Sequence, residues 1–227
     1  MITAPPTFRG EFETHVTVRA DSPATLDAFE RFAGARDLKF THIRLARGRV
    51  REQPMLTAGF AGAYAEVRAS VDRLVADVVA AGFPVVRTKI EATPWAEGVP
   101  ADDEQARALG PGYYFEHHVK LLLPVGTDGD ALAAVAAVHA AHLSVNARRT
   151  RAGGGAERFV TQRCRLVGDA DAAARARELL VDLELRGYEI LSVEREFVVH
   201  DSDESVDAGW IDERRESLTA DVRGAVL

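Results

Sequence analysis

The sequence contains a single cysteine, Cys164, and no excess of positive charge. One cysteine cannot form an intramolecular disulfide, which excludes a disulfide-stapled secreted scaffold and favours a reducing compartment. The formal net charge of −7 argues against bulk nucleic-acid or membrane binding, because both need a basic surface. No basic stretch followed by an apolar one opens the chain, and the longest apolar run, Ala131–Leu143, is too short to span a bilayer. We therefore expect a soluble cytoplasmic protein.

Several motifs of nucleotide and metal chemistry are also missing. The chain has no P-loop, no dinucleotide fingerprint, no nucleophile elbow and no zinc-knuckle spacing. No cofactor is therefore expected from a sequence motif.

What the chain does contain is a repeat of itself, which has to be found before any fold is assigned. Four short segments recur in the same order and at nearly the same separation. They are Phe12–Val18 with Phe115–Leu121, Thr41–Leu45 with Ala141–Val145, Met55–Thr57 with Phe159–Thr161, and Gly82-Phe83 with Gly187-Tyr188. The sequence thus predicts a tandem duplication.

Each copy has the periodicity of a strand–helix–strand–strand–helix–strand unit. Two such crossovers around a hairpin predict an α+β fold, a duplicated ferredoxin-like βαββαβ unit with antiparallel sheets and both helices on one face. The predicted strands are 11–19, 39–47, 50–57 and 85–91 in the first copy, and 114–122, 142–148, 157–166 and 189–199 in the second. The predicted organisation is a first repeat at 8–93, a linker at 94–112, a second repeat at 113–200 and an acidic tail at 201–227, in which Trp210 and Ile211 are candidates for docking on the body.

Alternation along the strands predicts which side chains share the sheet face that the helices leave open. We expect Phe12, Val16, Ile43, Leu45, Leu143 and Val145 to face the helices. The opposite face is then rich in charge, and four of the seven histidines lie on it. Its expected members are Glu13, His15, Thr17, His42, Arg44, Thr57, Arg87, Lys89, Glu91, Glu116, His118, Lys120, His142, Ser144, Asn146, Arg148, Thr161, Ser192, Glu194 and Glu196.

Histidine is the natural acid or base at neutral pH, and arginine and lysine bind anions. If both open faces meet at one cleft, the sequence predicts a site for a phosphorylated or other anionic small molecule. The expected catalytic residues are His15, His42, His118 and His142. The expected substrate-binding residues are Thr17, Arg44, Thr57, Lys89, Lys120, Ser144, Arg148, Arg151 and Thr161, the glycine triplet 153–155 beside Arg151 being suited to a phosphate.

Two of these histidines stand in motifs that resemble a known family. His15-Val16-Thr17-Val18 and His142-Leu143-Ser144-Val145 resemble the paired His-x-Thr/Ser-hydrophobic motifs of the 2H phosphoesterases, duplicated two-lobed proteins that act on cyclic phosphodiesters and RNA ends. The resemblance implies a phosphoesterase-like hydrolase in which one histidine is the general base, the other the general acid, and the hydroxyls hold the phosphate. The two motifs lie on non-equivalent strands, however, and their repeat counterparts at His118 and His42 carry Lys120 and Arg44 in place of the hydroxyl.

Two other interpretations of the same face stay open. Glu13-x-His15 and Glu116-x-His118 place a carboxylate and an imidazole two residues apart on one face in both copies. With Glu91, Glu196, His42 or His142 nearby, three or four ligands could hold a divalent metal ion, which suits a metal-dependent enzyme. Alternatively, the chain is a non-catalytic ligand-binding or oligomerising module, as a monomer or a homodimer, whose polar face carries cross-strand charge pairs.

Overall fold

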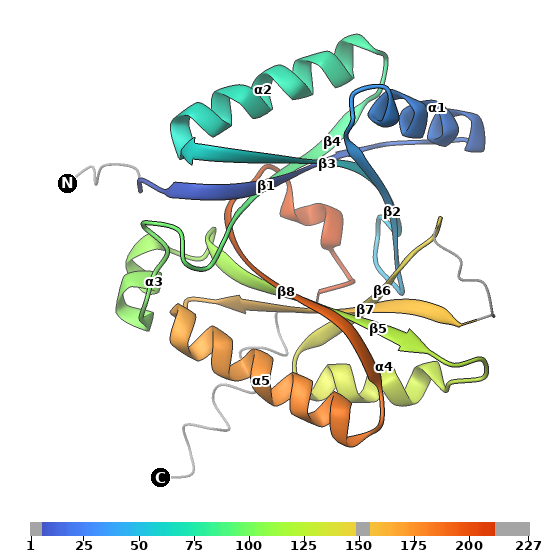
Figure 1. Ribbon diagram of the computed structural model, residues 1–227, viewed down its shortest axis with the longest axis vertical. Helices are drawn as coiled ribbons and strands as arrows, with labels where there is room; N and C mark the ends of the chain where they lie inside the picture. Colours follow the sequence, from blue (N-terminus) through green and yellow to red (C-terminus); the bar gives the residue numbers. More distant parts are fainter. Residues whose placement is uncertain (1–5, 149–154, 212–227) are drawn as a thin grey trace.

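The computed structural model describes residues 6–148 and 155–211, and both predicted repeats are present in it (Figure 1). The first comprises β1 (Arg9–Val18), α1 (Pro23–Gly34), β2 (Lys39–Leu45), β3 (Glu52–Ala63), α2 (Tyr64–Ala80) and β4 (Val85–Ala92). The second comprises β5 (Tyr114–Leu123), α4 (Gly129–Val138), β6 (Ala141–Asn146), β7 (Ala156–Arg165), α5 (Asp169–Leu185) and β8 (Glu189–Asp201). The fold is therefore α+β, a duplicated ferredoxin-like unit with antiparallel strands.

The helix ends follow from local sequence. Helix α1 begins at Pro23, directly after Ser22, whose hydroxyl accepts a hydrogen bond from the Thr25 amide as an N-cap. Helices α2 and α5 each end before a glycine with positive φ, Gly82 at 89° and Gly187 at 79°. At both ends the amide of the next residue donates back into the last helical turn, the pattern of a glycine C-cap.

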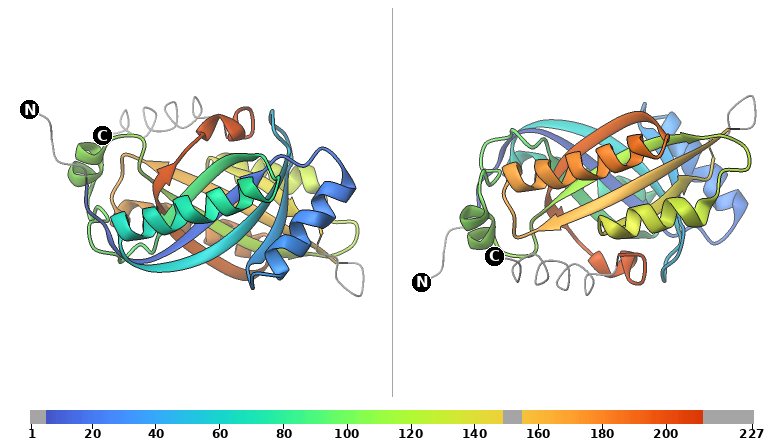
Figure 2. Two further views of the ribbon diagram at one scale, coloured as in Figure 1. Left: turned by 90° about the horizontal axis from the view of Figure 1, so that it is seen from above. Right: turned by 90° about the horizontal axis from the view of Figure 1, so that it is seen from below.

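The two sheets join edge to edge into one closed barrel, instead of facing each other across an open cleft. The strand order is β1-β3-β2-β6-β7-β5-β8-β4, and the seams between the repeats are β2–β6 and β4–β8. Closure pairs the backbone groups that four edge strands would otherwise expose. Helices α1 and α2 cover one side of the barrel and α4 and α5 the opposite side (Figure 2).

Apolar residues on the outer face of the strands pack beneath these helices. One cluster in each repeat is local: Phe29 and Leu56 belong to the first, and Leu132 and Val160 to the second. A further cluster spans both repeats, with Phe12, Val67 and Ile90 from the first and Phe115 and Phe197 from the second. The predicted helix-facing positions of β1, Phe12 and Val16, are confirmed.

The segment between the repeats is partly helical, although a surface loop is expected from its prolines. Helix α3 (Asp103–Leu109) begins after Asp102, whose side chain accepts from the Gln105 amide, and the Asp103 carboxylate accepts from the Gly168 amide.

After β8 the chain forms a short 3-10 helix, η1 (Glu204–Asp207), beyond which Trp210 and Ile211 pack against Leu45. The rest of the predicted acidic tail, 212–227, lies outside the described residues. Among the helices that the structure describes, none combines the length and apolar character needed to cross a membrane.

Candidate functional site

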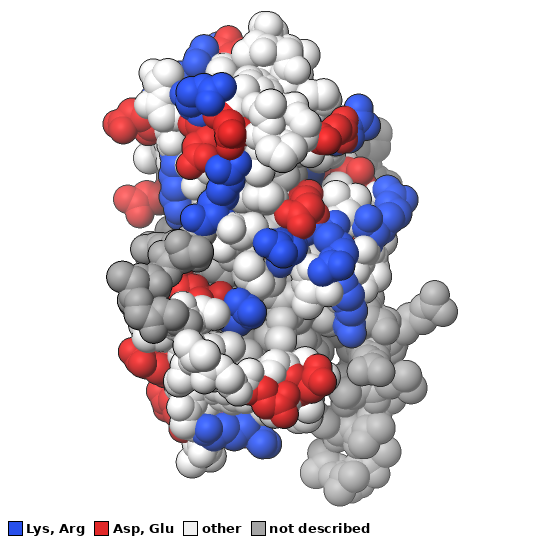
Figure 3. Space-filling view, turned by 90° about the vertical axis from the view of Figure 1, so that its right-hand side faces the viewer, with Lys and Arg blue, Asp and Glu red and all other residues white. Residues whose placement is uncertain are grey.

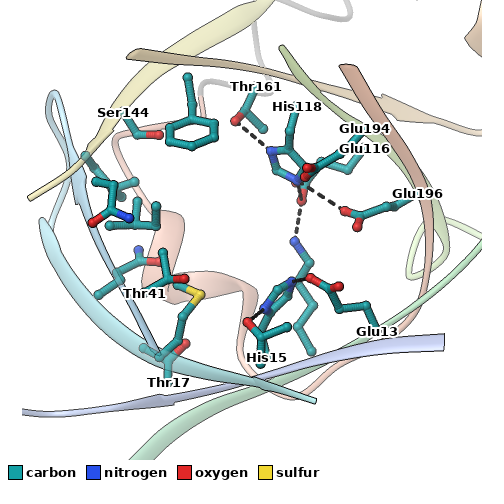
Figure 4. A pocket seen from close by; sticks show the side chains of 18 of the residues that line it. Glu13, His15, Thr17, Thr41, Glu116, His118, Ser144, Thr161, Glu194 and Glu196 are labelled. Carbon is teal, nitrogen blue, oxygen red and sulfur yellow. Dashed lines mark hydrogen bonds and ion pairs between the residues drawn. The ribbon is translucent and has the colours of Figure 1, made fainter. Parts of the chain in front are cut away.

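The barrel encloses a cavity of about 190 Å³, lined by residues of both repeats. An eight-stranded barrel is wide enough inside for side chains alone or for one small ligand. Figure 4 shows two unlike sides to this cavity: His15, Glu13, Glu116, His118 and Glu196 lie together, across from Thr17, Thr41 and Ser144. Ile43, Met55, Asn146 and Phe159 also line the cavity, as do the cations Lys39, Arg87 and Lys120. The lining therefore combines a cluster of histidines and glutamates with apolar, neutral polar and further charged side chains.

The ionisable side is built from two equivalent sets, one in each repeat. The His15 imidazole shares a hydrogen bond with the Thr57 hydroxyl through Nδ1 at 2.9 Å, and His118 does the same with Thr161 at 3.0 Å. Each histidine lies directly opposite its threonine, in the β1–β3 and β5–β7 pairings respectively. Because a hydroxyl can both donate and accept, it holds the imidazole in place whichever protonation state the ring adopts.

With Nδ1 held in this way, Nε2 of each ring points at glutamates. His15 Nε2 is 2.9 Å from a Glu91 carboxylate oxygen, and His118 Nε2 is 3.4 Å from oxygens of both Glu116 and Glu196. Glu91 on β4 and Glu196 on β8 are repeat counterparts. The repeat symmetry therefore extends to His, Thr and Glu, and it is broken by Lys89, whose counterpart is Glu194.

Lys89 contacts two of these carboxylates, Glu91 at 2.6 Å and Glu116 at a shorter distance. Glu116 is also held by the Arg163 guanidinium, from Nη2 at 2.8 Å and from Nε at 3.0 Å. Both oxygens of Glu116 are thus engaged by cations that lie almost wholly out of solvent. Glu116 is a structural anchor of the interior ion network.

Burial and neighbouring charge shift several pKa values here. Burial alone would lower the pKa of His118, but its bonds to Glu116 and Glu196 and their charges raise it to about 10. The pKa of His15 is raised in the same way, chiefly by Glu91 against the effect of burial. Burial and the negative charge of Glu91 raise the pKa of Glu196 to about 7, whereas Lys89 and His15 lower that of Glu91 despite its burial. At neutral pH His118 is therefore a proton donor.

Two further cations that line the cavity, Arg87 and Lys120, have carboxylate partners. Arg87 contacts Asp201 at 2.5 Å and Asp207 at 3.0 Å, and Lys120 lies 3.1 Å from Glu157. The lining is thus of mixed charge, as the sequence predicts, and these cations contact carboxylates of the protein itself.

Most of the predicted site residues do line this cavity. They are His15, Thr17, Thr57, Lys89, His118, Lys120, Ser144 and Thr161, together with Glu13 and Glu116 of the alternative metal set. Whether they bind or catalyse anything stays a prediction. Alternation succeeds for the predicted residues of β1, β3, β5 and β7 because their neighbours in the chain, such as Val16, Leu56, Val119 and Val160, pack beneath the helices.

The prediction for β2 is wrong. His42 and Arg44 lie on the outer face of the barrel, where both contact Glu52, and Lys39, Thr41, Ile43 and Leu45 face the cavity. The reason is that Trp210, from the C-terminal segment, packs against Leu45 inside this end of the barrel. Apolar residues of β2 therefore point inward here, and Phe40 instead packs on Phe29 of α1.

Two further predicted residues do not line the cavity. His142 shares the inward face of β6 with Ser144, but its ring lies 5.9 Å from that of Trp210, which lines the cavity, and its Nδ1 is 3.5 Å from the Arg47 guanidinium. Arg148 contacts Asp27 and Glu30 on the outside. Side chains of both signs alternate on the face seen in Figure 3, and no broad basic region stands out there. Arg151 lies outside the described residues.

The structure therefore separates the histidines of the two His-x-Thr/Ser motifs, since His15 lines the cavity and His142 does not. The resemblance to the 2H phosphoesterases finds no support in this arrangement.

Sequence reasoning missed part of the interior. Arg163 follows Thr161 by two residues, so alternation places it on the same face, and it could have been found in this way. Asp207 contacts Arg87, Arg163 and Gln53, yet no local pattern marks it.

No family model matches the chain, and no curated protein matches it. Among solved structures, the acetolactate synthase small subunit from Thermotoga maritima is similar with a TM-score of 0.31 and 10% identity, over 83% of this chain and 94% of the other. The regulatory subunit of aspartate kinase from Thermus thermophilus, in its ligand-free form, has a TM-score of 0.31 and 11% identity, over 78% of this chain and 94% of the other. Likenesses of this size carry no conclusion about function.

Proposed function

We propose that this chain binds a small polar molecule inside its barrel, with hydrogen-bonding groups of the ligand at the His15–His118 side and its less polar part against Met55 and Phe159. The observation that carries the proposal is the convergence of two equivalent His–Thr pairs, His15–Thr57 and His118–Thr161, one from each repeat, on a single cavity. Ligand sites are typically concave, partly apolar and supplied with a few oriented polar groups.

The charges of the lining favour a neutral or cationic group of the ligand at this side. Glu91, Glu116 and Glu196 lie close together, and the nearby cations Arg87, Lys89 and Lys120 already contact carboxylates. An anion bound by one of these three cations would have to displace its carboxylate, which costs free energy because it leaves a buried charge without its partner. The anionic ligand expected from the sequence is therefore the weaker proposal.

A thermal-shift screen tests the binding proposal, using amino acids, amines, polyols, nucleosides, cyclic phosphodiesters and sugar phosphates. A compound that binds only the folded state raises the melting temperature with its occupancy. We expect a stabilising compound whose effect is lost in His118→Gln and weakened in Ser144→Ala, which changes the opposite side of the cavity without removing a charge.

His42→Gln is the matched control, because His42 also pairs with a glutamate but lies on the outer face of the barrel. It should leave the shift unchanged. A compound that stabilises His118→Gln and Ser144→Ala as strongly as the parent protein would place its site outside the cavity and contradict the proposal.

A further inference from the structure

We infer that the ionisable side of the cavity binds a divalent transition-metal cation, with His15, His118, Glu91 and Glu196 as its ligands. The inference rests on the cavity of the proposed function and names a cation for it. It narrows the metal alternative expected from the sequence, which is built on Glu13, His15, Glu116 and His118. Glu91 and Glu196, there only further candidates, take the place of Glu13 and Glu116 as the carboxylate ligands.

The donor atoms already lie close together. One ligand atom each from Glu91, His118 and Glu196 lies within 4.8 Å of the other two, and His15 Nε2 is 2.9 Å from Glu91. Ligand atoms at about 2.0 to 2.2 Å from a common ion are at most about 4.4 Å apart. Small side-chain rotations would therefore bring these donors to metal distances.

Glu91 and Glu196 are the proposed carboxylate ligands because lysine and arginine side chains do not hold both of their oxygens. Glu116 is held at both oxygens by Lys89 and Arg163, and the Glu13 side chain is 42% exposed. The Glu91 side chain is 1% exposed and that of Glu196 16%. Lys89 contacts one oxygen of Glu91, and the other faces His15.

Both imidazoles are oriented as metal ligands usually are. A ligating histidine generally uses its second ring nitrogen in a hydrogen bond that fixes the tautomer and the direction of the ring. Thr57 does this for His15 and Thr161 for His118, at equivalent positions of the two repeats. Two imidazole nitrogens, which lose their protons to solvent as the metal binds, and two carboxylates form a donor set suited to zinc, cobalt, iron or manganese ions.

The route that we infer for the cation, from solvent to the cavity, is lined by negative charge. Strand β4 ends at Ala92, opposite Phe197, so residues 193–196 of β8 extend past its end. An outer groove lies at this place, beside Trp95, and Glu13, Glu194 and Glu196 line both the groove and the cavity. Carboxylates along an entry path raise the local concentration of cations.

Titration of the full-length, chelator-treated protein with Co²⁺ tests the inference, followed by absorption spectroscopy, with Zn²⁺ binding measured by calorimetry. We expect one equivalent to bind and a ligand-field band to appear. His118→Gln and Glu196→Gln should each weaken binding by at least about tenfold, and Thr161→Val, which keeps the imidazole, by about 10- to 100-fold.

The controls are His42→Gln and Glu52→Gln, which alter a His–Glu pair of 2.7 Å on the outer face. They should keep the stoichiometry and affinity of the parent protein. Absence of the Co²⁺ band in the parent protein would overturn the inference, and so would equal Co²⁺ binding by the cavity variants and the controls. If the other cavity variants do not fold, the Co²⁺ affinity of Thr161→Val alone is compared with that of the controls. An organic ligand that stabilises the chelator-treated protein in a His118- and Ser144-dependent way, without any Co²⁺ band, would reject the metal and retain the proposed function.

Discussion

His117 and His118, adjacent residues of β5, have pKa values that are shifted in opposite directions, lowered for His117 and raised for His118. His118 points into the cavity, where glutamates raise its pKa to about 10. His117 points to the outer face, is fully buried there, and pairs with the Gln162 side chain at 3.0 Å. Burial lowers the pKa of His117 to about 4, because the hydrogen bond with Gln162 and the charge of Glu116 offset only part of the desolvation of the charged ring.

The lowered pKa of His117 predicts a loss of stability in acid. A folded-state pKa below the unfolded value means that protonation favours unfolding, so this contribution is complete above the unfolded pKa of 6.5 and is lost as the pH falls toward 4. The free energy of unfolding, measured by urea titration, should fall in this window by up to about 3 kcal/mol on this account. His117→Gln should flatten the curve, and parallel curves for the two proteins would contradict the prediction.

Most cavity residues could be predicted from the sequence because β1 and β5 are central strands with one polar and one apolar face. Glu13, His15, Glu116 and His118 were assigned to the correct face for this reason. The prediction fails at Ile43. Alternation shows only which residues of a strand share a face, and the further assumption that the apolar face meets the helices does not hold in β2. In β2 the apolar partner is Trp210, which lies far along the chain and comes from a segment without strand periodicity.

At the scale of elements, the C-terminal segment ties the two repeats together. Asp207, at the end of η1, contacts Arg87 of the first repeat and Arg163 of the second, and both arginines are almost wholly buried. Its carboxylate also accepts a hydrogen bond from Gln53. The docking of Trp210 could be anticipated from its isolation in a polar tail, but the role of Asp207 could not, because its partners are distant in the sequence.

Removing the charge of Asp207 is therefore expected to be costly. Asp207→Asn should lower the free energy of unfolding by about 3 kcal/mol, the low end for breaking a buried ion pair, because Arg87 and Arg163 each keep a second carboxylate. The matched control is Asp72→Asn, which removes an exposed pair with Arg68 on α2 and should cost about 1 kcal/mol or less. Chemical denaturation of the three proteins checks this, and equal losses in both variants would show that Asp207 is not an anchor.

At the scale of the whole molecule, the duplication was evident in the sequence and the closure was not. The internal repeat shows that there are two βαββαβ units. It does not show how their edge strands pair, because β2 and β6, and β4 and β8, carry no sequence pattern that marks them as partners. The β2–β6 seam pairs Ile43 with Asn146 and Leu45 with Ser144, and the β4–β8 seam pairs Lys89 with Asp201. We propose that the predicted repeats, 8–93 and 113–200, form one folding unit, because one apolar cluster and both seams cross between them.

This proposal predicts a single cooperative unfolding transition. Trp95 is 79% exposed whereas Trp210 is buried against Leu45, so Trp95→Phe leaves one fluorophore that reports on the first repeat and the C-terminal segment. In this variant the fluorescence of Trp210 and the far-ultraviolet circular dichroism of the whole chain should give coincident urea transitions, which is the test of two-state behaviour. If the repeats were independent units, the dichroism would show two steps and the fluorescence would follow only one. Coincidence is expected because separating either repeat from the other would expose four strand edges and the buried charges of Arg87, Lys89 and Glu116 at the same time.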